Sequence, residues 1–146
     1  MIWIIALVFL VILGNLFWLL PSRAERHRMA LRNKAIKLGL TCREIRGASA
    51  LPVGVDPVDG PWLEYALTID TADEMVPVSM EKSPEGRWNG SADLTQEWLA
   101  SLPESVVRVI CRDNTVAVLW NEQGEKSDVV EINQFLIRVA ESFKWL

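Results

Sequence analysis

An uninterrupted apolar run at the N-terminus constrains this chain more than any other feature. Residues 2–20 read IWIIALVFLVILGNLFWLL, and only Gly14 and Asn15 fall outside the apolar set. A helix of 19 residues is about 28 Å long, close to the bilayer hydrocarbon thickness of about 30 Å. No charged residue interrupts the run. The sequence therefore predicts a transmembrane anchor over residues 1–21.

A cleaved secretory signal is the alternative explanation of this run. Such a signal carries positive charge before a shorter apolar stretch and has a small-residue cleavage site soon after it. Here the positive charge follows the run, and the A-x-A sequence Ala48-Ser49-Ala50 begins 28 residues beyond Leu20. We therefore expect an anchor that stays in place.

The residues that follow the run are strongly basic. Residues 23–46 hold eight lysines and arginines against two glutamates, a local charge of +6. Lysine and arginine near the end of a span are retained on the cytoplasmic side. We therefore expect a single-pass protein of a bacterial inner (plasma) membrane, with its N-terminus outside and everything after Pro21 in the cytoplasm.

Several of these residues are candidates for contact with membrane lipid. Tryptophan favours the membrane–water interface, and the two tryptophans of the run stand near its two ends. Four basic residues fall within an arc of about 80° on a helix with 100° per residue, where they could face anionic headgroups. The predicted lipid contacts are Trp3, Trp18, Arg23, Arg26, Lys34 and Lys37.

Residues 22–39 predict a second, basic juxtamembrane helix. Ser22 and Glu25 have the spacing of a capping box, and Gly39 suits a helix end. Met29, Ile36 and Leu40 share a face of this helix that we expect to contact protein.

Residues 40–146 predict an acidic cytoplasmic α+β domain, in which a small, mostly antiparallel sheet of four or five strands is packed by a C-terminal helix. Strands are predicted at 40–46, 63–70, 76–80, 105–112 and 115–122, the last two forming a hairpin around Asp113-Asn114. Pro77 predicts that its strand lies at an edge of the sheet. Residues 47–61 form a Gly/Pro-rich loop, a short helix is predicted near 93–102, and Ile132, Leu136, Val139, Ala140 and Phe143 give the C-terminal helix its apolar face.

The charge of the domain bears on its partners. Residues 47–146 hold seven basic and seventeen acidic residues, a net charge of −10. Phosphate groups repel such a surface. We therefore expect no nucleic-acid partner, and a domain held off the membrane.

No pattern of residues predicts a catalytic, cofactor or metal site. His27 is the one histidine, so metal sites built from two or more histidines cannot form, and we expect no Ser-His-Asp triad. The two cysteines, Cys42 and Cys111, are expected to be free thiols in a reducing cytoplasm. We predict no cofactor and no enzymatic activity.

One pair of motifs loosely resembles the cyclic-dinucleotide motif of PilZ domains. The pair is Arg28-x-x-x-Arg32 followed by Glu81-x-Ser83-x-x-Gly86. The resemblance would imply that the arginines hold ligand phosphates. Glu81 stands where that family has Asp or Asn, and the arginines lie in the predicted basic helix, so no site residue is carried over.

The layout of anchor, basic segment and compact domain resembles that of small inner-membrane accessory proteins of secretion, division or envelope machinery. We expect a protein-binding adaptor or accessory subunit, whose oligomeric state the sequence leaves open. The alternative is a membrane-tethered small-ligand sensor or enzyme with a dispersed site, which a pocket at Asp70, Asp73 or Arg43 would favour. The candidate partner contacts are Gly14, Asn15, Pro77, Trp88 and Trp145.

Overall fold

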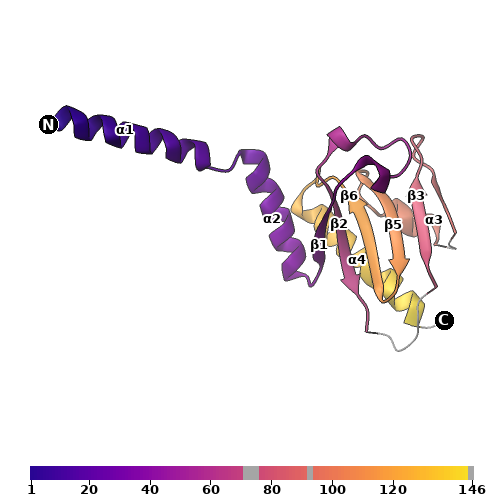
Figure 1. Ribbon diagram of the computed structural model, residues 1–146. Helices are drawn as coiled ribbons and strands as arrows, with labels where there is room; N and C mark the ends of the chain where they lie inside the picture. Colours follow the sequence, from indigo (N-terminus) through magenta and orange to yellow (C-terminus); the bar gives the residue numbers. More distant parts are fainter. Residues whose placement is uncertain (71–75, 92–93, 145–146) are drawn as a thin grey trace.

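The computed structural model describes residues 1–70, 76–91 and 94–144 (Figure 1). Its centre is an antiparallel sheet of six strands in the order β1-β2-β6-β5-β3-β4. The α+β class is confirmed, with one strand more than the sequence predicted. The strands are β1 (Thr41–Ile45), β2 (Trp62–Thr68), β3 (Val78–Lys82), β4 (Trp88–Gly90), β5 (Val106–Arg112) and β6 (Thr115–Trp120). The α-helices are α1 (Ile2–Leu19), α2 (Arg23–Lys37), α3 (Gln96–Ala100) and α4 (Lys126–Lys144), and two 3₁₀ turns span Ala48–Ala50 and Pro57–Asp59.

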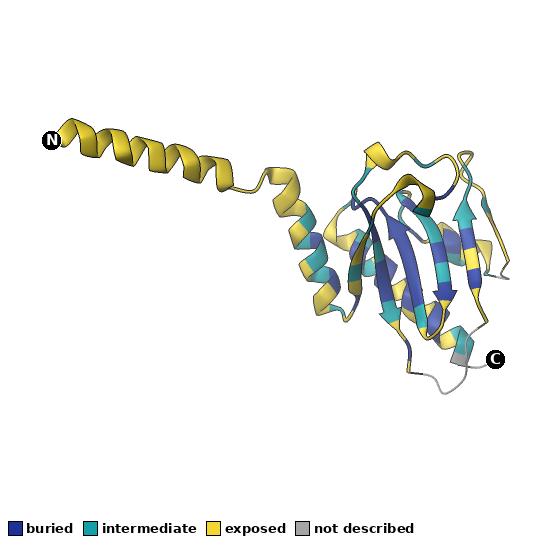
Figure 2. Cartoon of the chain, in the orientation of Figure 1, coloured by how far each residue is buried: buried dark blue, intermediate teal, exposed yellow. Residues whose placement is uncertain are grey.

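The apolar helix α1 stands clear of the rest of the chain. None of its residues is buried, and Figure 2 shows it exposed along its whole length. After the short link at Leu20, Pro21 and Ser22, α2 runs across the direction of α1 and along the side of the sheet (Figure 1). α1 therefore contributes nothing to the core of the folded part.

Helices cover one face of the sheet and form the main core with it. α4 presents Ile132, Leu136 and Val139 to the sheet, all fully buried as the sequence predicted. Its first turn is closed by Asp128, whose carboxylate accepts a hydrogen bond of 2.7 Å from the backbone N–H of Glu125. Burial of one such aliphatic side chain contributes about 1.5–3 kcal/mol, so α4 and the sheet stabilise each other.

The opposite face of the sheet is partly covered by the Gly/Pro-rich segment 47–61. Leu51 from this segment packs with Trp62 and Leu119 in a second, small apolar cluster. The indole N–H of Trp62 donates to the backbone oxygen of Asp56 at 3.1 Å. The segment is therefore fastened to the sheet rather than being a free hinge.

The predicted hairpin is confirmed. β5 and β6 pair from Val106 with Trp120 to Arg112 with Thr115, with an irregularity in register between Val106 and Arg108. Asp113 in the turn has a φ of 51°, a left-handed conformation that aspartate tolerates better than most residues. The β-branched residues of the strands and the residues of the turn thus both favour the β5–β6 hairpin.

The prediction that the Pro77 strand lies at an edge is wrong. β3 begins at Val78, after the proline, and pairs with β5 on one side and β4 on the other. Pro77 lies outside the ladder, so it removes no hydrogen bond from it. The strands at the two edges are β1 and β4.

The prediction of which side of α2 contacts protein is also wrong in part. Leu31 and Ala35 are fully buried against the folded part, whereas Met29 and Ile36 are 54% and 61% exposed. Leu40 is buried, as expected. Two different faces of α2 carry apolar residues, and contacts with distant elements decide which of them is covered.

Candidate functional site

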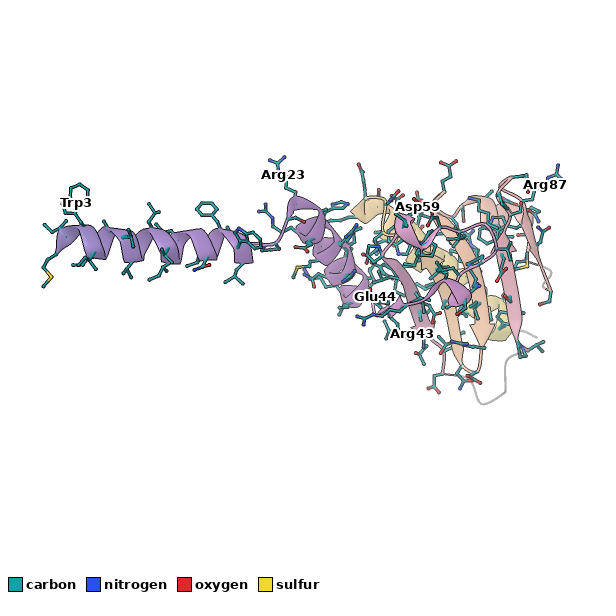
Figure 3. The ribbon with its side chains drawn as sticks, turned by 45° about the horizontal axis from the view of Figure 1, so that its top comes forward. Trp3, Arg23, Arg43, Glu44, Asp59 and Arg87 are labelled. Carbon is teal, nitrogen blue, oxygen red and sulfur yellow. The ribbon has the colours of Figure 1, made fainter. Side chains whose placement is uncertain are left out.

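The apolar helix is the first candidate for a functional element. By length and composition α1 is able to cross a membrane, and an N-terminal signal sequence meets the same test. Trp3 projects from its free end (Figure 3), and Trp3 and Trp18 are 86% and 92% exposed. Gly14 and Asn15 lie on the same exposed helix.

Helix α2 brings the predicted basic residues into one exposed array. The capping box is confirmed, because Ser22 Oγ accepts from the Glu25 backbone N–H at 3.2 Å and Glu25 Oε2 accepts from the Ser22 N–H at 3.0 Å. Arg23 projects outward from the start of the helix (Figure 3). The exposed basic residues of this array are Arg23, Arg26 and Lys37, and Lys34 is half-buried.

One buried carboxylate joins α2 to the sheet. The side chain of Glu122, just after β6, has no exposed surface. Its Oε1 accepts from Arg32 Nε at 2.8 Å and its Oε2 from Arg32 Nη2 at 3.0 Å. The phenolic O–H of Tyr65 on β2 donates to the same Oε1 at 2.9 Å. A bidentate arginine with a third donor satisfies a carboxylate that burial alone would penalise.

The electrostatics of neighbouring groups follow from this arrangement. The hydrogen bond with Glu122 raises the pKa of Arg32 above its usual value, so the guanidinium stays charged. Burial, reinforced by the Glu122 carboxylate, raises the pKa of Tyr65 well above 10, so the phenol stays a donor. Burial and the same carboxylate raise the pKa of the half-buried thiol of Cys42 to about 11. These shifts describe a structural ion pair beside two protonated groups, with no activated nucleophile.

Further contacts hold the same corner of the fold. His27 Nε2 lies 2.7 Å from the carbonyl oxygen of Gly124, which accepts a hydrogen bond from the ring N–H. The backbone of Glu122 is left-handed, with a φ of 57°. The side-chain amides of its two neighbours, Asn121 and Gln123, both donate to the carbonyl oxygen of Asp59. The segment between β6 and α4 thus ties together α2, the 47–61 segment and the sheet.

Sequence reasoning missed this cluster, and its signal is faint. Arg32 and Glu122 are 90 residues apart, and each belongs to a stretch with other charges of the same sign. A glutamate directly after an apolar, β-branched strand is the one local hint. It does not identify the arginine that pairs with it.

An open groove lies beside the edge strand β4. Its volume is about 620 Å³, and its walls come from β3, β4, the turn between them and the 47–61 segment. Its lining includes Val53, Pro84 and small polar residues such as Ser91, together with the charged residues Glu81 and Lys82. A second hollow of about 190 Å³ adjoins it and shares Val53 and Pro84. An open groove beside an unpaired strand edge is suited to an extended peptide.

The predicted partner residues do not come together. Pro77 is exposed before β3. Trp88 is half-buried against the main core, with Lys82 Nζ 5.9 Å from its ring centre. Gly14 and Asn15 lie on the separate helix α1, and Trp145 lies outside the described residues.

The residues that would favour a ligand site are also apart. Arg43 makes an exposed ion pair with Glu64 at 3.4 Å, and neither Arg43 nor Asp70 lines the two hollows described above. Asp73 lies outside the described residues. Among the described residues, no group of three or more histidine, cysteine, aspartate or glutamate side chains is placed to hold a metal ion.

The motif resembling that of PilZ domains is engaged in internal contacts. Arg32 is bound to Glu122, and Glu81 pairs with Arg108 at 2.8 Å. Arg32 and Glu81 are therefore each paired with a residue outside the motif.

Comparison with known proteins adds no identity: no protein-family model, curated protein or solved structure matches this chain.

Proposed function

We propose that the chain is a single-pass membrane protein whose folded domain binds another protein as an adaptor or accessory subunit. The anchor would be α1, and the domain would lie on the side that carries the basic residues of α2. The proposed site is a bacterial inner membrane, with the domain in the cytoplasm and held at the surface where membrane complexes assemble. Confinement of this kind raises the effective concentration of a binding domain near its partners.

The observation that carries the proposal is the attachment of α2. A link of three residues joins an apolar helix of bilayer length to a basic helix, and the Arg32–Glu122 pair fixes the basic helix to the sheet. Such a connection holds the domain close to the anchor, which is what an accessory subunit requires.

The groove beside β4 is the surface that we assign to the partner. An extended segment of another protein would lie along the edge strand, with apolar side chains against Val53 and Pro84. Val53 is 90% exposed, so its side chain is available for such contacts. The partner's segment would be neutral or basic, because the domain is strongly acidic.

The test is affinity capture of partners by the full chain in mild detergent. Val53→Asp would place a charge in the groove without disturbing a buried side chain, and we expect it to abolish capture. Val58→Asp is the matched control, because Val58 is 84% exposed on the same segment and lines neither hollow. We expect Val58→Asp to capture the partner as the unchanged chain does.

Deletion of residues 1–21 distinguishes a partner that binds the folded domain from one that docks within the bilayer. A partner that is captured equally by the deleted chain would bind the folded domain, as proposed. A partner that is captured only with α1 present, and equally by Val53→Asp, would show docking within the bilayer through a surface such as Gly14 and Asn15. Recovery of a bound small molecule in place of a protein would favour the sensor or enzyme alternative.

A further inference from the structure

The side of α2 that faces away from the domain carries both apolar and basic residues. Met29 and Ile36 are 54% and 61% exposed, and Arg26 and Lys37 are also exposed. In a soluble helix the exposed side is usually polar throughout. We call these four residues the outer face of α2.

The outer face is regular. With about 100° per residue, Met29 and Ile36 lie about 20° apart around the helix and about 10 Å apart along it. Arg26 and Lys37 lie about 20° apart by the same measure, on the neighbouring strip. The two strips flank the direction opposite to the buried residues Leu31 and Ala35. An apolar strip beside a basic strip is the pattern of a helix that lies in the surface of a membrane.

The position of α2 in the chain supports a lipid contact over a protein contact. Only Leu20, Pro21 and Ser22 separate α1 from α2, and three extended residues reach about 10 Å at most. Because α2 runs across the direction of α1 (Figure 1), a bilayer that contains α1 would keep all of α2 near its surface. The Arg32–Glu122 pair fixes the rotation of α2, so that the outer face points away from the domain.

We propose that the outer face of α2 lies in the headgroup layer of a membrane that contains anionic phospholipid, with Met29 and Ile36 inserted between the lipids and Arg26 and Lys37 paired with their phosphates. This inference rests on the proposed membrane anchorage. It adds that the domain is held in one orientation relative to the lipid. The two apolar residues belong to the membrane contact as much as the basic ones do.

The test is photo-crosslinking of the full chain in nanodiscs of phosphatidylcholine and phosphatidylglycerol. The photoreactive residue benzoylphenylalanine replaces Met29 or Ile36, and Val58, on the exposed 47–61 segment, is the matched control. We expect a phospholipid mass adduct at positions 29 and 36 and background labelling at position 58. Arg26→Gln with Lys37→Gln should reduce the adduct several-fold, whereas Arg87→Gln on the β3–β4 turn should leave it unchanged.

Co-elution of the chain with the nanodisc is measured in the same experiment and reports whether α1 inserts. Failure to co-elute would refute the anchorage and this inference together. A chain that co-elutes but gives no lipid adduct at 29 or 36 would refute the inference alone. Adducts from one chain to another would also overturn it, because the outer face would then be an interface between two copies.

Discussion

The Glu122 carboxylate is the residue on which the attachment of α2 depends. Its side chain is wholly buried, and it receives two hydrogen bonds from Arg32 and one from Tyr65. Removing one member of such a pair is strongly destabilising, because the other charge is left buried without a partner. The first prediction therefore concerns removal of the arginine.

Replacement Arg32→Met should lower the free energy of unfolding by about 3 kcal/mol, because it leaves a buried carboxylate without its cation. The measurement is urea unfolding of the full chain in detergent. Arg23→Met is the control on the same helix, since Arg23 is exposed, and it should stay within about 0.5 kcal/mol. Equal effects of the two replacements would show that the Glu122 pair adds nothing to stability.

Alkaline pH should destabilise the fold through the half-buried thiol of Cys42 and the buried thiol of Cys111. Burial raises the pKa of Cys42 to about 11 and that of Cys111 to about 12, whereas an unfolded cysteine has a pKa of about 8.5. Above that pH the unfolded state loses its thiol protons first and so binds fewer protons than the folded state. The free energy of unfolding should therefore fall as pH rises from about 8.5 towards 11.

Unfolding free energies measured at about pH 7.5, 9 and 10 would check this dependence, because these pH values bracket the pKa of a free thiol. The variant with Cys42→Ala and Cys111→Ala should show a smaller decline over the same interval. Tyr65, whose pKa is also raised, accounts for part of what remains. An equal decline in the double variant would contradict the assignment to the thiols.

At the scale of the element, α2 behaves as part of the folded domain and not as a separate lipid-bound rod. Leu31 is fully buried, and the helix contacts α4 and β1. Leu31→Ala should cost about 3 kcal/mol and should speed hydrogen exchange of the α2 amides more than that of the α4 amides. Met29→Ala, at a position 54% exposed, should change stability in detergent by less than about 0.5 kcal/mol. Uniform faster exchange across both helices would show that α2 does not open on its own.

Elements with a repeating pattern were predictable from the sequence, and elements defined by distant contacts were not. The apolar spacing of α4 and the hairpin around Asp113 are confirmed because local residues determine them. β4 escaped prediction because three residues cannot display a periodicity. Pro77 suggested an edge strand, but β3 begins only after the proline and is paired on both sides. The covered side of α2 was misassigned for a similar reason. Leu31 and Ile36 are both apolar, and contacts with residues far along the chain, such as the Arg32–Glu122 pair, select between their faces.

At the scale of the whole molecule, the charge distribution makes a prediction about topology. Eight basic residues in 23–46 should keep the folded domain on the cytoplasmic side. In inverted inner-membrane vesicles, protease should digest the domain without detergent, and in right-side-out vesicles it should not. The mass of the membrane-extracted chain should include residues 1–20. A mature chain that lacks them would show a cleaved signal in place of an anchor, and a domain digested only from the outer side would show the opposite topology.

The short link between α1 and α2 also limits which proteins the groove can reach. The link consists only of Leu20, Pro21 and Ser22, so it allows the domain little displacement from the anchor. A long flexible linker would let the domain occupy a much larger volume. With α1 in a bilayer, the β4 groove would stay at one nearly constant height above the lipid. Partners would be selected by the height of their binding segment above the bilayer as well as by its sequence. A matching segment that another membrane protein holds closer to the lipid or farther from it would not reach the groove.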